Sequence, residues 1–282
     1  MKEIKNIELK HFTTLNIGGL CKHVFFPENE EEIRSILSQY DPIVLGCGSN
    51  VLINDEIVYD SAMVLTHFNK IYRVNNSVIA QAGARLMDVC LFAYSEGFGG
   101  LEFAYGIPGS VGGAIMMNAG AYGGEIKEVV SQVISTKKEY TNEECEFDYR
   151  HSIFTDSNEC ILQATFDLYP KEKSLIHMKM KELIDKRIEK QPLDQHSAGS
   201  TFKRGKDFYA SQLINECNLK GYHVKDAMVS EKHAGFLINK KEASYQDFCQ
   251  LIKDVQRIVY EKTNKKLECE VKIIGEKNDL CK

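Results

Sequence analysis

The sequence has no apolar run that approaches the roughly 20 residues needed to cross a bilayer. Its first twelve residues, MKEIKNIELKHF, are charged and lack both the apolar core and the small-residue cleavage site of a secretory signal. With 282 residues, of which 43% are hydrophobic and 27% charged, the composition is typical of a soluble globular chain of roughly two domains. We therefore expect a cytoplasmic protein without a membrane span.

Several common kinds of site are also missing. The nine cysteines contain no C-x-x-C pair, which fits reduced thiols. The eight histidines show neither H-x-H nor H-E-x-x-H spacing, so we expect no metal site. Ser49 and Ser110 lack a glycine two positions earlier, which excludes a G-x-S-x-G nucleophile elbow. The net charge of −5 argues against nucleic acid as a partner, so any phosphate recognition must be local.

The two best-known nucleotide-binding loops are absent as well. A strand-like run at 43–45 leads into GCGSN at 46–50, but a dinucleotide G-x-G-x-x-G would need glycine at Val51, and no G-x-x-x-x-G-K-[ST] occurs. The glycines and small polar residues of this turn still allow several backbone N–H groups to point at one anion. If the turn binds pyrophosphate, it does so outside those two folds.

Glycine, in contrast, is concentrated in one stretch. Residues 97–124, GFGGLEFAYGIPGSVGGAIMMNAGAYGG, hold ten of the twenty glycines. Such clustering indicates backbone at positive φ, or a ligand lying against main chain where a Cβ would collide. Apolar residues between the glycines, and the near absence of charge before Glu125, indicate burial. A large, flat, phosphate-bearing ligand fits this stretch best, and a tightly turned packing segment is the alternative.

The remaining elements follow from hydrophobic periodicity. Helices are expected at 30–40, 84–96, 171–190, 209–217 and 244–265. Strands are expected at 21–26, 43–45, 62–65, 78–82, 129–135, 144–147, 160–168 and 267–274, and the runs 62–65 and 78–82 are interpreted as a hairpin. The long helix before Pro192 has an apolar stripe formed by Leu175, Met178, Leu183, Ile184 and Ile188. Residues 197–205 are expected to form a second small-residue loop, and a domain boundary is expected near Pro170.

Three polar residues stand out in apolar or small-residue surroundings: Arg150, Ser200 and Glu270. Each also has a structural interpretation. Arg150 is a possible ion-pair partner, Ser200 a possible cap or turn residue, and Glu270 one of two outward carboxylates with Glu268. The residues by themselves leave both interpretations open.

Seven motifs follow one another along the chain: FTTLNIGG (12–19), LGCGSN (45–50), GLEFAYGIPGSVGGAIMMNAGAYGG (100–124), YRHSIF (149–154), QPLDQHSAGSTFKR (191–204), LKGYHVKDAMVSEKHAGFLIN (219–239) and LECEVKIIG (267–275). In this order they closely resemble the UDP-N-acetylenolpyruvoylglucosamine reductase family, flavoenzymes of peptidoglycan precursor synthesis and hence of cell-wall formation. The match runs nearly from end to end.

The resemblance implies an α+β fold with two domains. Residues 1–170 would form a two-lobed FAD-binding module of the vanillyl-alcohol-oxidase (PCMH) type, with lobes at about 1–65 and 66–170. Residues 171–282 would form a smaller α+β substrate-binding domain. Because only Cys47 lies in a cofactor loop as a possible attachment point, the FAD is expected to be noncovalent. The cofactor-binding residues implied by the motifs are Gly46, Cys47, Gly48, Ser49, Asn50, Gly106, Gly109, Ser110, Gly112, Gly113, Asn118 and Ala119.

The resemblance also implies the chemistry. NADPH reduces FAD, and hydride then passes to the enolpyruvyl group of UDP-N-acetylglucosamine enolpyruvate, giving UDP-N-acetylmuramate. Arg150 and Glu270 match positions that stabilise the negative charge of the intermediate, and Ser200 matches the proton donor. Tyr149, Lys203 and Arg204 are expected to bind the substrate.

Two features distinguish this chain within the resemblance. Lys203 is followed by Arg204 and Gly205, where many relatives have asparagine and proline. Only 50 positions separate Arg150 from Ser200, which leaves little room for a tyrosine-bearing lid insertion and indicates the shorter subgroup. Two other functions remain open: another FAD oxidoreductase of this fold that acts on a sugar or lactone, and a nucleotide-binding protein without catalytic activity.

Overall fold

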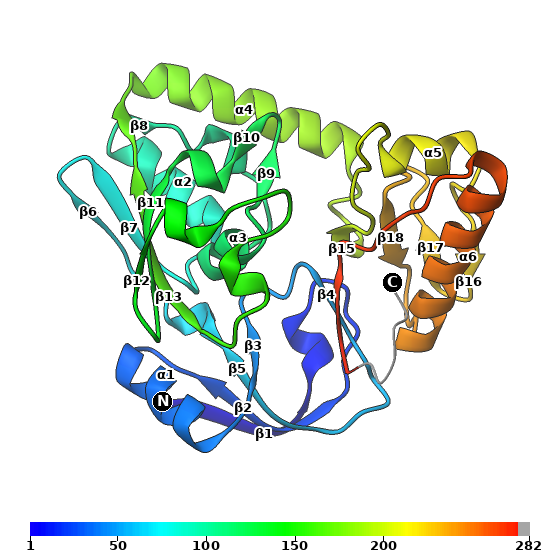
Figure 1. The fold of residues 1–282 in the computed structure, drawn as a ribbon, viewed down its shortest axis with the longest axis horizontal. Coiled ribbons are helices and arrows are strands. Elements are labelled where there is room, and N and C mark those ends of the chain that lie inside the picture. The colour runs from blue at the N-terminus through cyan, green and yellow to red at the C-terminus, as the bar shows by residue number, and fades with distance from the viewer. Residues whose placement is uncertain (276–282) are drawn as a thin grey trace. The chain divides into compact units, whose positions relative to one another are not determined.

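The computed structural model describes residues 1–275, and by backbone contacts the chain divides into two compact units (Figure 1). Unit 1 contains residues 1–4, 23–47 and 61–187, and unit 2 contains 5–22, 48–60 and the chain from 188 onward. The functional division into residues 1–170 and 171–282 stays a prediction, and it differs from this division by contacts. Within residues 1–275, no helix combines the length and apolarity that a membrane span requires.

The largest sheet of unit 1 has five strands in the order β12-β11-β13-β7-β6, and every neighbouring pair is antiparallel. Its strands are β6 (Ile71–Val74), β7 (Ser77–Gln81), β11 (Val130–Ser135), β12 (Glu139–Thr141) and β13 (Ile161–Asp167). The hairpin expected from the runs 62–65 and 78–82 is wrong. Strand β7 instead turns back to β6 at Asn75, which adopts a positive φ of 52°. Strand β6 is mostly exposed, so its sequence lacks the apolar alternation from which a strand is predicted.

A second sheet has the strand order β1-β2-β5-β3. Its strands are β1 (Lys2–Glu8), β2 (Leu20–Phe26), β3 (Ile43–Leu45) and β5 (Tyr59–Val64), and the unit boundaries fall within β1, β2 and β5. Strands β3 and β5 are parallel, so a crossover must connect them. Helix α1 (Glu30–Gln39) precedes β3, and its N-cap Asn29 accepts a hydrogen bond from the Glu32 amide at 3.0 Å.

Unit 1 also contains helices α2 (Leu86–Ser95), α3 (Val111–Met116) and most of α4 (Lys173–Lys190). The apolar face predicted for α4 is partly wrong, because Leu175, Met178 and Ile188 are exposed. The buried face is formed by Ile176, Met180, Leu183 and Arg187. The prediction assumed that only apolar residues face the core, so it could not include Arg187 in the buried face. The strand expected at 144–147 is also wrong, because a 3₁₀ turn (Glu143–Cys145) occupies this position.

Short elements complete unit 1. Two-residue strands pair as β8 (Phe98–Gly99) with β14 (Tyr169–Pro170) and β9 (Gly120–Ala121) with β10 (Gly124–Glu125). Further 3₁₀ turns are Leu65–His67, Glu102–Ala104, Ile126–Glu128 and Ile153–Thr155. The glycine-rich stretch is therefore regular structure in short pieces, and its buried apolar residues belong to the main core of this unit.

Unit 2 is built on a sheet with the order β15-β18-β17-β16. Its elements are β15 (His196–Ser200), α5 (Ala210–Glu216), β16 (His223–Val224), β17 (Ala227–Val229), β18 (Phe236–Asn239) and α6 (Tyr245–Thr263). A 3₁₀ turn (Leu9–Phe12) and the parallel pair β4 (Val51–Ile53) and β19 (Lys272–Ile274) complete it. The loop predicted at 197–205 thus begins as a strand, and the strand predicted at 267–274 is regular only over its last three residues.

A buried ion pair anchors the glycine-rich stretch. Glu102 is 7% exposed, accepts a hydrogen bond from Lys171 Nζ at 2.8 Å and accepts another from the Gly100 amide at 2.8 Å. Burial raises the pKa of Glu102, but these hydrogen bonds outweigh it and hold the pKa below the ordinary 4.5. The pair therefore stabilises the fold above pH 4.5, and this contribution is lost as the pH falls through the lowered pKa.

Replacing Lys171 with methionine should leave a buried carboxylate without its cation. We expect Lys171→Met to lower the free energy of unfolding by about 1–3 kcal/mol at pH 7, and by less at an acidic pH below the lowered pKa of Glu102, where the carboxyl is protonated. Denaturant titrations at both pH values measure this. Lys179→Met, an exposed position of the same helix, is the control. An equal loss for Lys171→Met at both pH values would contradict the role of the pair.

Candidate active site

Three segments of unit 1 pack together around α3. Gly46 lies against Ser110 so closely that a Cβ on Gly46 would sit 2.0 Å from Ser110 Oγ. Residues 82–86 run beside 109–112 through backbone hydrogen bonds. These are donated by the Leu86 amide to Gly109 O (2.9 Å), by the Val111 amide to Ala84 O (2.9 Å) and by the Gly112 amide to Ala82 O (2.8 Å). The predicted cofactor residues at 46–47 and 109–113 are thus brought together, with 82–86 as a segment that sequence reasoning missed.

The amides of both glycines in α3 are used within the protein, and Gly113 leaves open space. The Gly112 amide is engaged by Ala82, and the Gly113 amide donates to the N-cap Ser110 Oγ at 3.4 Å. A Cβ on Gly113 would meet nothing within 4 Å except Ser110 Oγ at 3.5 Å. This open strip of main chain, without side chains, fits a flat cofactor lying against α3. The residues present therefore fit FAD.

The turn at 46–50 crosses from unit 1 to unit 2 after Cys47. In unit 2, Gly48 has φ +61° and lies against Phe12, where a Cβ would be 2.0 Å from the carbonyl oxygen. The Thr14 amide donates to Gly48 O at 3.0 Å, and the Thr14 hydroxyl donates to Ser197 O at 2.6 Å. The FTTLNIGG motif thus supports both the glycine turn and strand β15.

Asn118, predicted to bind the cofactor, is fully buried, and the protein itself uses its side-chain amide. Its Nδ2 donates to Asp148 O (3.0 Å) and Glu125 Oε2 (3.1 Å), and its Oδ1 accepts from the Lys127 amide (3.0 Å). The neighbouring Ala119 amide donates to Ala114 O. Asn118 therefore holds the turn that begins at Asp148.

That turn carries Tyr149 and Arg150. The backbones of Asp148 and His151 pair with each other on either side of it, and Arg150 adopts a positive φ of 55°. Strained non-glycine backbone of this kind is found most often at functional sites. Arg150 Nη2 donates to Gly120 O at 3.4 Å, and its guanidinium carbon lies 5.3 Å from the ring centre of Tyr149. The carbonyl of strand β9 therefore helps to set the direction of this arginine.

Ser200, in unit 2, is the last residue of β15, where the strand bulges. The pairing of β15 with β18 shifts register between Ser197 and Ser200, and Gly199 between them has φ +75°. Ser200 then lies opposite Phe236. Bulges of this kind turn a side chain out of the regular strand pattern and are common beside active sites.

Glu270 lies on the neighbouring extended segment of the same unit. Its amide donates to Thr201 O at 2.8 Å, and Phe202 is bridged to Cys269. The side chain of Asn50 donates to Glu270 O at 3.4 Å. Two of the three predicted catalytic residues, Ser200 and Glu270, are therefore brought together by backbone pairing.

Of the predicted substrate-binding cations, Lys203 forms an ion pair with Glu268. Gly205 lies against the ring of Phe208, and a Cβ there would come within 2.2 Å of Phe208 Cε1. The packing of Phe208 therefore requires a residue without a side chain at this position.

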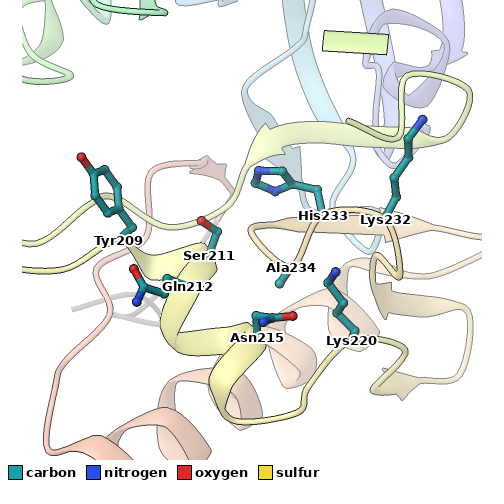
Figure 2. Close-up of a pocket in the computed structure, with 8 residues that line it drawn as sticks. All are labelled: Tyr209, Ser211, Gln212, Asn215, Lys220, Lys232, His233 and Ala234. Carbon is teal, nitrogen blue, oxygen red and sulfur yellow. The ribbon is translucent and has the colours of Figure 1, made fainter. Parts of the chain in front are cut away.

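A pocket of about 420 Å³ lies in unit 2 beside α5 (Figure 2). Its lining residues are polar or basic except for Ala234: Tyr209, Ser211, Gln212, Asn215, Lys220, Lys232, His233 and Ala234. Figure 2 shows that Ser211, Gln212 and Asn215 come from α5, whereas Lys232, His233 and Ala234 come from the turn before β18. Two lysines at a hollow of this size suit a phosphate-bearing ligand.

His233 connects this pocket to Ser200. Its ring packs edge-on against Phe236 with centres 4.9 Å apart, and Phe236 is the residue opposite Ser200. Burial lowers the pKa of His233, so the ring is neutral at pH 7. Its Nδ1 accepts from the Gly235 amide at 3.2 Å, which leaves the ring proton on Nε2 as a donor.

Sequence reasoning assigned no role to the pocket residues, although LKGYHVK and EKHAGFLIN were among the family motifs. Lysine and histidine are common on surfaces, and only the fold shows that Lys220 and Lys232 share one hollow. Within residues 1–275, no group of three or more His, Cys, Asp or Glu side chains is arranged to hold a metal ion.

The class of protein follows from these observations together. A family model described as "FAD binding domain" matches residues 21–137, which include the Gly46 and Ser110 loops. The expected α+β fold is confirmed, and the chain is an FAD-binding oxidoreductase. A second model, described as "UDP-N-acetylenolpyruvoylglucosamine reductase, C-terminal domain", matches residues 191–274, which include Ser200, Glu270 and the pocket.

Comparison with known proteins gives the particular family. The UDP-N-acetylenolpyruvoylglucosamine reductase of Geobacillus thermodenitrificans is 44% identical and covers 97% of this chain and 93% of its own. The reductase of Clostridium novyi is 42% identical, and the match covers 99% of this chain and 94% of the relative. The crystal structure of the Thermus caldophilus reductase superposes with a TM-score of 0.83 at 31% identity, and the match covers 97% of this chain and 98% of that one. The chain belongs to the UDP-N-acetylenolpyruvoylglucosamine reductase family, as its motifs indicated.

Gly113 allows the cofactor surface to be tested. Because a Cβ at Gly113 meets almost nothing in the protein, Gly113→Ala should leave the apoprotein as stable or up to about 1 kcal/mol more stable, since alanine favours the helix. A cofactor lying on this strip would collide with the methyl group, so we expect the FAD dissociation constant to rise roughly tenfold or more. Titration of the apoprotein by flavin fluorescence measures it.

The control is Gly97→Asn. Gly97 follows α2 at φ +74°, a position where asparagine is tolerated next best. This variant should change stability slightly and leave FAD affinity unchanged. Unaltered FAD affinity in Gly113→Ala would rule out a cofactor on this face of α3.

Proposed function

We propose that this protein catalyses the NADPH-dependent reduction of UDP-N-acetylglucosamine enolpyruvate to UDP-N-acetylmuramate, a step of peptidoglycan synthesis. The observation that carries the proposal is the backbone pairing of the Ser200 segment with the Glu270 segment, in a unit that also contains a basic pocket. Membership of the reductase family supports it, and a sugar or lactone oxidase is not favoured because the curated relatives share the reductase name. Its partners are then the nucleotide sugar and NADPH, and its expected location is the cytoplasm.

The cofactor is held by backbone surface. In unit 1, Gly46, Cys47 and residues 109–113 would contact FAD. Gly48, Ser49 and Asn50, which follow in the same turn, stay predicted cofactor residues. When bound, FAD would supply the chemistry for hydride transfer between NADPH and the methylene carbon of the enolpyruvyl group.

The protein stabilises the charge that the substrate then carries. The guanidinium of Arg150, which donates to Gly120 O, would pair with the substrate carboxylate, on which negative charge builds. Glu270 contributes in protonated or hydrogen-bonded form, since an ionised carboxylate would repel that charge. Ser200 gives its hydroxyl proton to the adjacent carbon, which is far more basic than an alkoxide in water. Hydride and proton together saturate the double bond.

The pocket beside α5 is assigned to the diphosphate of the nucleotide sugar. Lys220 and Lys232 supply positive charge, and His233 supplies a neutral N–H donor. His233 packs on Phe236, and Phe236 lies opposite Ser200, so the pocket borders the strand pair that carries the proton donor. Lys203 and Arg204 remain predicted substrate contacts.

Ser200 is tested by separating the two half-reactions. Ser200→Ala should keep NADPH-dependent flavin bleaching at the wild-type rate while slowing reoxidation by the enolpyruvyl nucleotide by roughly 10²-fold or more, because only the second half-reaction needs the proton. Stopped-flow absorbance follows both. Ser197→Ala, on the same strand, should retain both rates. Equal loss in the two half-reactions of Ser200→Ala would exclude the proton-donor role.

Lys220 is tested by binding. Lys220→Gln removes one positive charge from the pocket, and we expect weaker binding of UDP-N-acetylmuramate by roughly tenfold, with a shallower dependence on salt. Calorimetric titration at two salt concentrations measures both. The matched control is Lys253→Gln, on the exposed side of α6. An unchanged dissociation constant for Lys220→Gln would place the diphosphate elsewhere.

A further inference from the structure

Arg187 is a charged side chain on the buried face of α4. It is 6% exposed, and burial lowers the pKa of its guanidinium from the usual value. Arginine remains protonated even so, and burying a cation carries a desolvation cost that an apolar side chain would avoid. Neither the sequence motifs nor the proposed chemistry gives this residue a role.

Its first contact is with the Gly106 turn. Gly106 has φ +89°, and a Cβ there would lie 2.6 Å from Ile184 Cδ1, 3.2 Å from Arg187 Cδ and 3.4 Å from Arg187 Nε. The last turns of α4 therefore lie directly on main chain at Gly106. Gly106 is one of the predicted cofactor residues. It lies three positions before Gly109, where the segment that pairs with residues 82–86 begins.

Its second contact is with the hairpin β9–β10. The turn of this hairpin is Tyr122–Gly123, where both residues have positive φ, as a two-residue hairpin of type I′ requires. The guanidinium carbon of Arg187 lies 5.7 Å from the ring centre of Tyr122, within cation–π range. Arg187 thus contacts the stretch both before and after α3, at Gly106 and at Tyr122.

The same hairpin reaches Arg150. Gly120, on strand β9, provides the carbonyl that accepts from Arg150 Nη2 at 3.4 Å. Glu125, on strand β10, accepts from buried Asn118, which also holds the carbonyl of Asp148. The hairpin is therefore held at its tip by Arg187 and is joined at its base to the turn of Arg150, and all these residues belong to unit 1.

We propose that Arg187 is a positioning residue: it clamps the Gly106 turn and the Tyr122 hairpin, and through the Gly120 carbonyl it sets the position of Arg150. The clamp on Gly106 acts on cofactor affinity, and the link to Arg150 acts on the reaction with the enolpyruvyl substrate. The second part rests on the proposed function, and the first does not.

The cofactor part is measured by the FAD dissociation constant of the apoprotein. Arg187→Met keeps an unbranched side chain and removes the cation, and we expect the constant to rise roughly tenfold. Arg187→Lys should recover most of the affinity. Tyr122→Leu should cost a similar factor, and the double variant should cost little more than either single one, because both remove one contact. Lys186→Met, an exposed neighbour paired with Glu182, is the control.

The Arg150 part is measured on FAD-saturated enzyme by the rate of reoxidation. Arg187→Met should slow reoxidation by the enolpyruvyl nucleotide at least fivefold and leave reduction by NADPH within twofold of wild type. In an Arg150→Ala background, Arg187→Met should cause no further slowing, since Arg187 acts through Arg150. Thermal unfolding of each variant separates this coupling from general loss of stability.

The outcomes are distinct. Wild-type FAD affinity in Arg187→Met would overturn the clamp on the cofactor loop, and fully multiplicative losses in the Arg150 double variant would overturn the link to Arg150. If reduced wild-type enzyme is not reoxidised by the enolpyruvyl nucleotide, the proposed function fails, and the FAD titrations still decide the clamp.

Discussion

The close approach of main chain at glycine is the constraint on which unit 1 depends. A Cβ would lie 2.0 Å from Ser110 Oγ at Gly46, 1.7 Å from Leu65 O at Gly83 and 2.5 Å from the Phe103 ring at Gly124. Real Cβ atoms do not make such contacts, so side chains at these positions would separate the loops. The loops that meet around α3 can do so because these residues are glycine. Because Gly113 also lacks a side chain, the main chain there stays open to a cofactor.

The contact units explain why motifs far apart in sequence serve one function. The FTTLNIGG segment belongs to unit 2, where Thr14 supports β15 and Asn239 Nδ2 donates to Leu15 O at 3.1 Å. Ser200 and Glu270 are then presented by the same sheet region, whereas Arg150 is presented by a strained turn of unit 1. Each proposed catalytic residue is thus set by backbone: a bulge for Ser200, a bridged segment for Glu270 and a positive φ for Arg150.

The sequence predicted those helices whose own residues show helical periodicity. Hydrophobic periodicity predicted α1, α2 and α6. In the structure α1 begins at the N-cap Asn29, α2 is followed by Gly97 at positive φ, and α6 begins with a capping box of Ser244 and Asp247. Predictions failed for elements whose pairing or burial depends on residues elsewhere in the chain. The strand pairing of β7 with exposed β6 has no apolar pattern, and the buried side of α4 includes Arg187, whose burial depends on the Gly106 turn and Tyr122.

Taken by itself, the sequence determined the family, because the order of the motifs is a property of the chain. The phosphate-bearing ligand at the glycine stretch and the catalytic roles of Arg150, Ser200 and Glu270 stay predictions. Only the tertiary structure decided that the Gly112 and Gly113 amides are used within the protein while Gly113 leaves open space, that Lys203 is paired with Glu268, and that Lys220, Lys232 and His233 share a pocket. These are relations between residues distant in sequence, and packing and hydrogen-bond competition among them are settled only when the chain is folded.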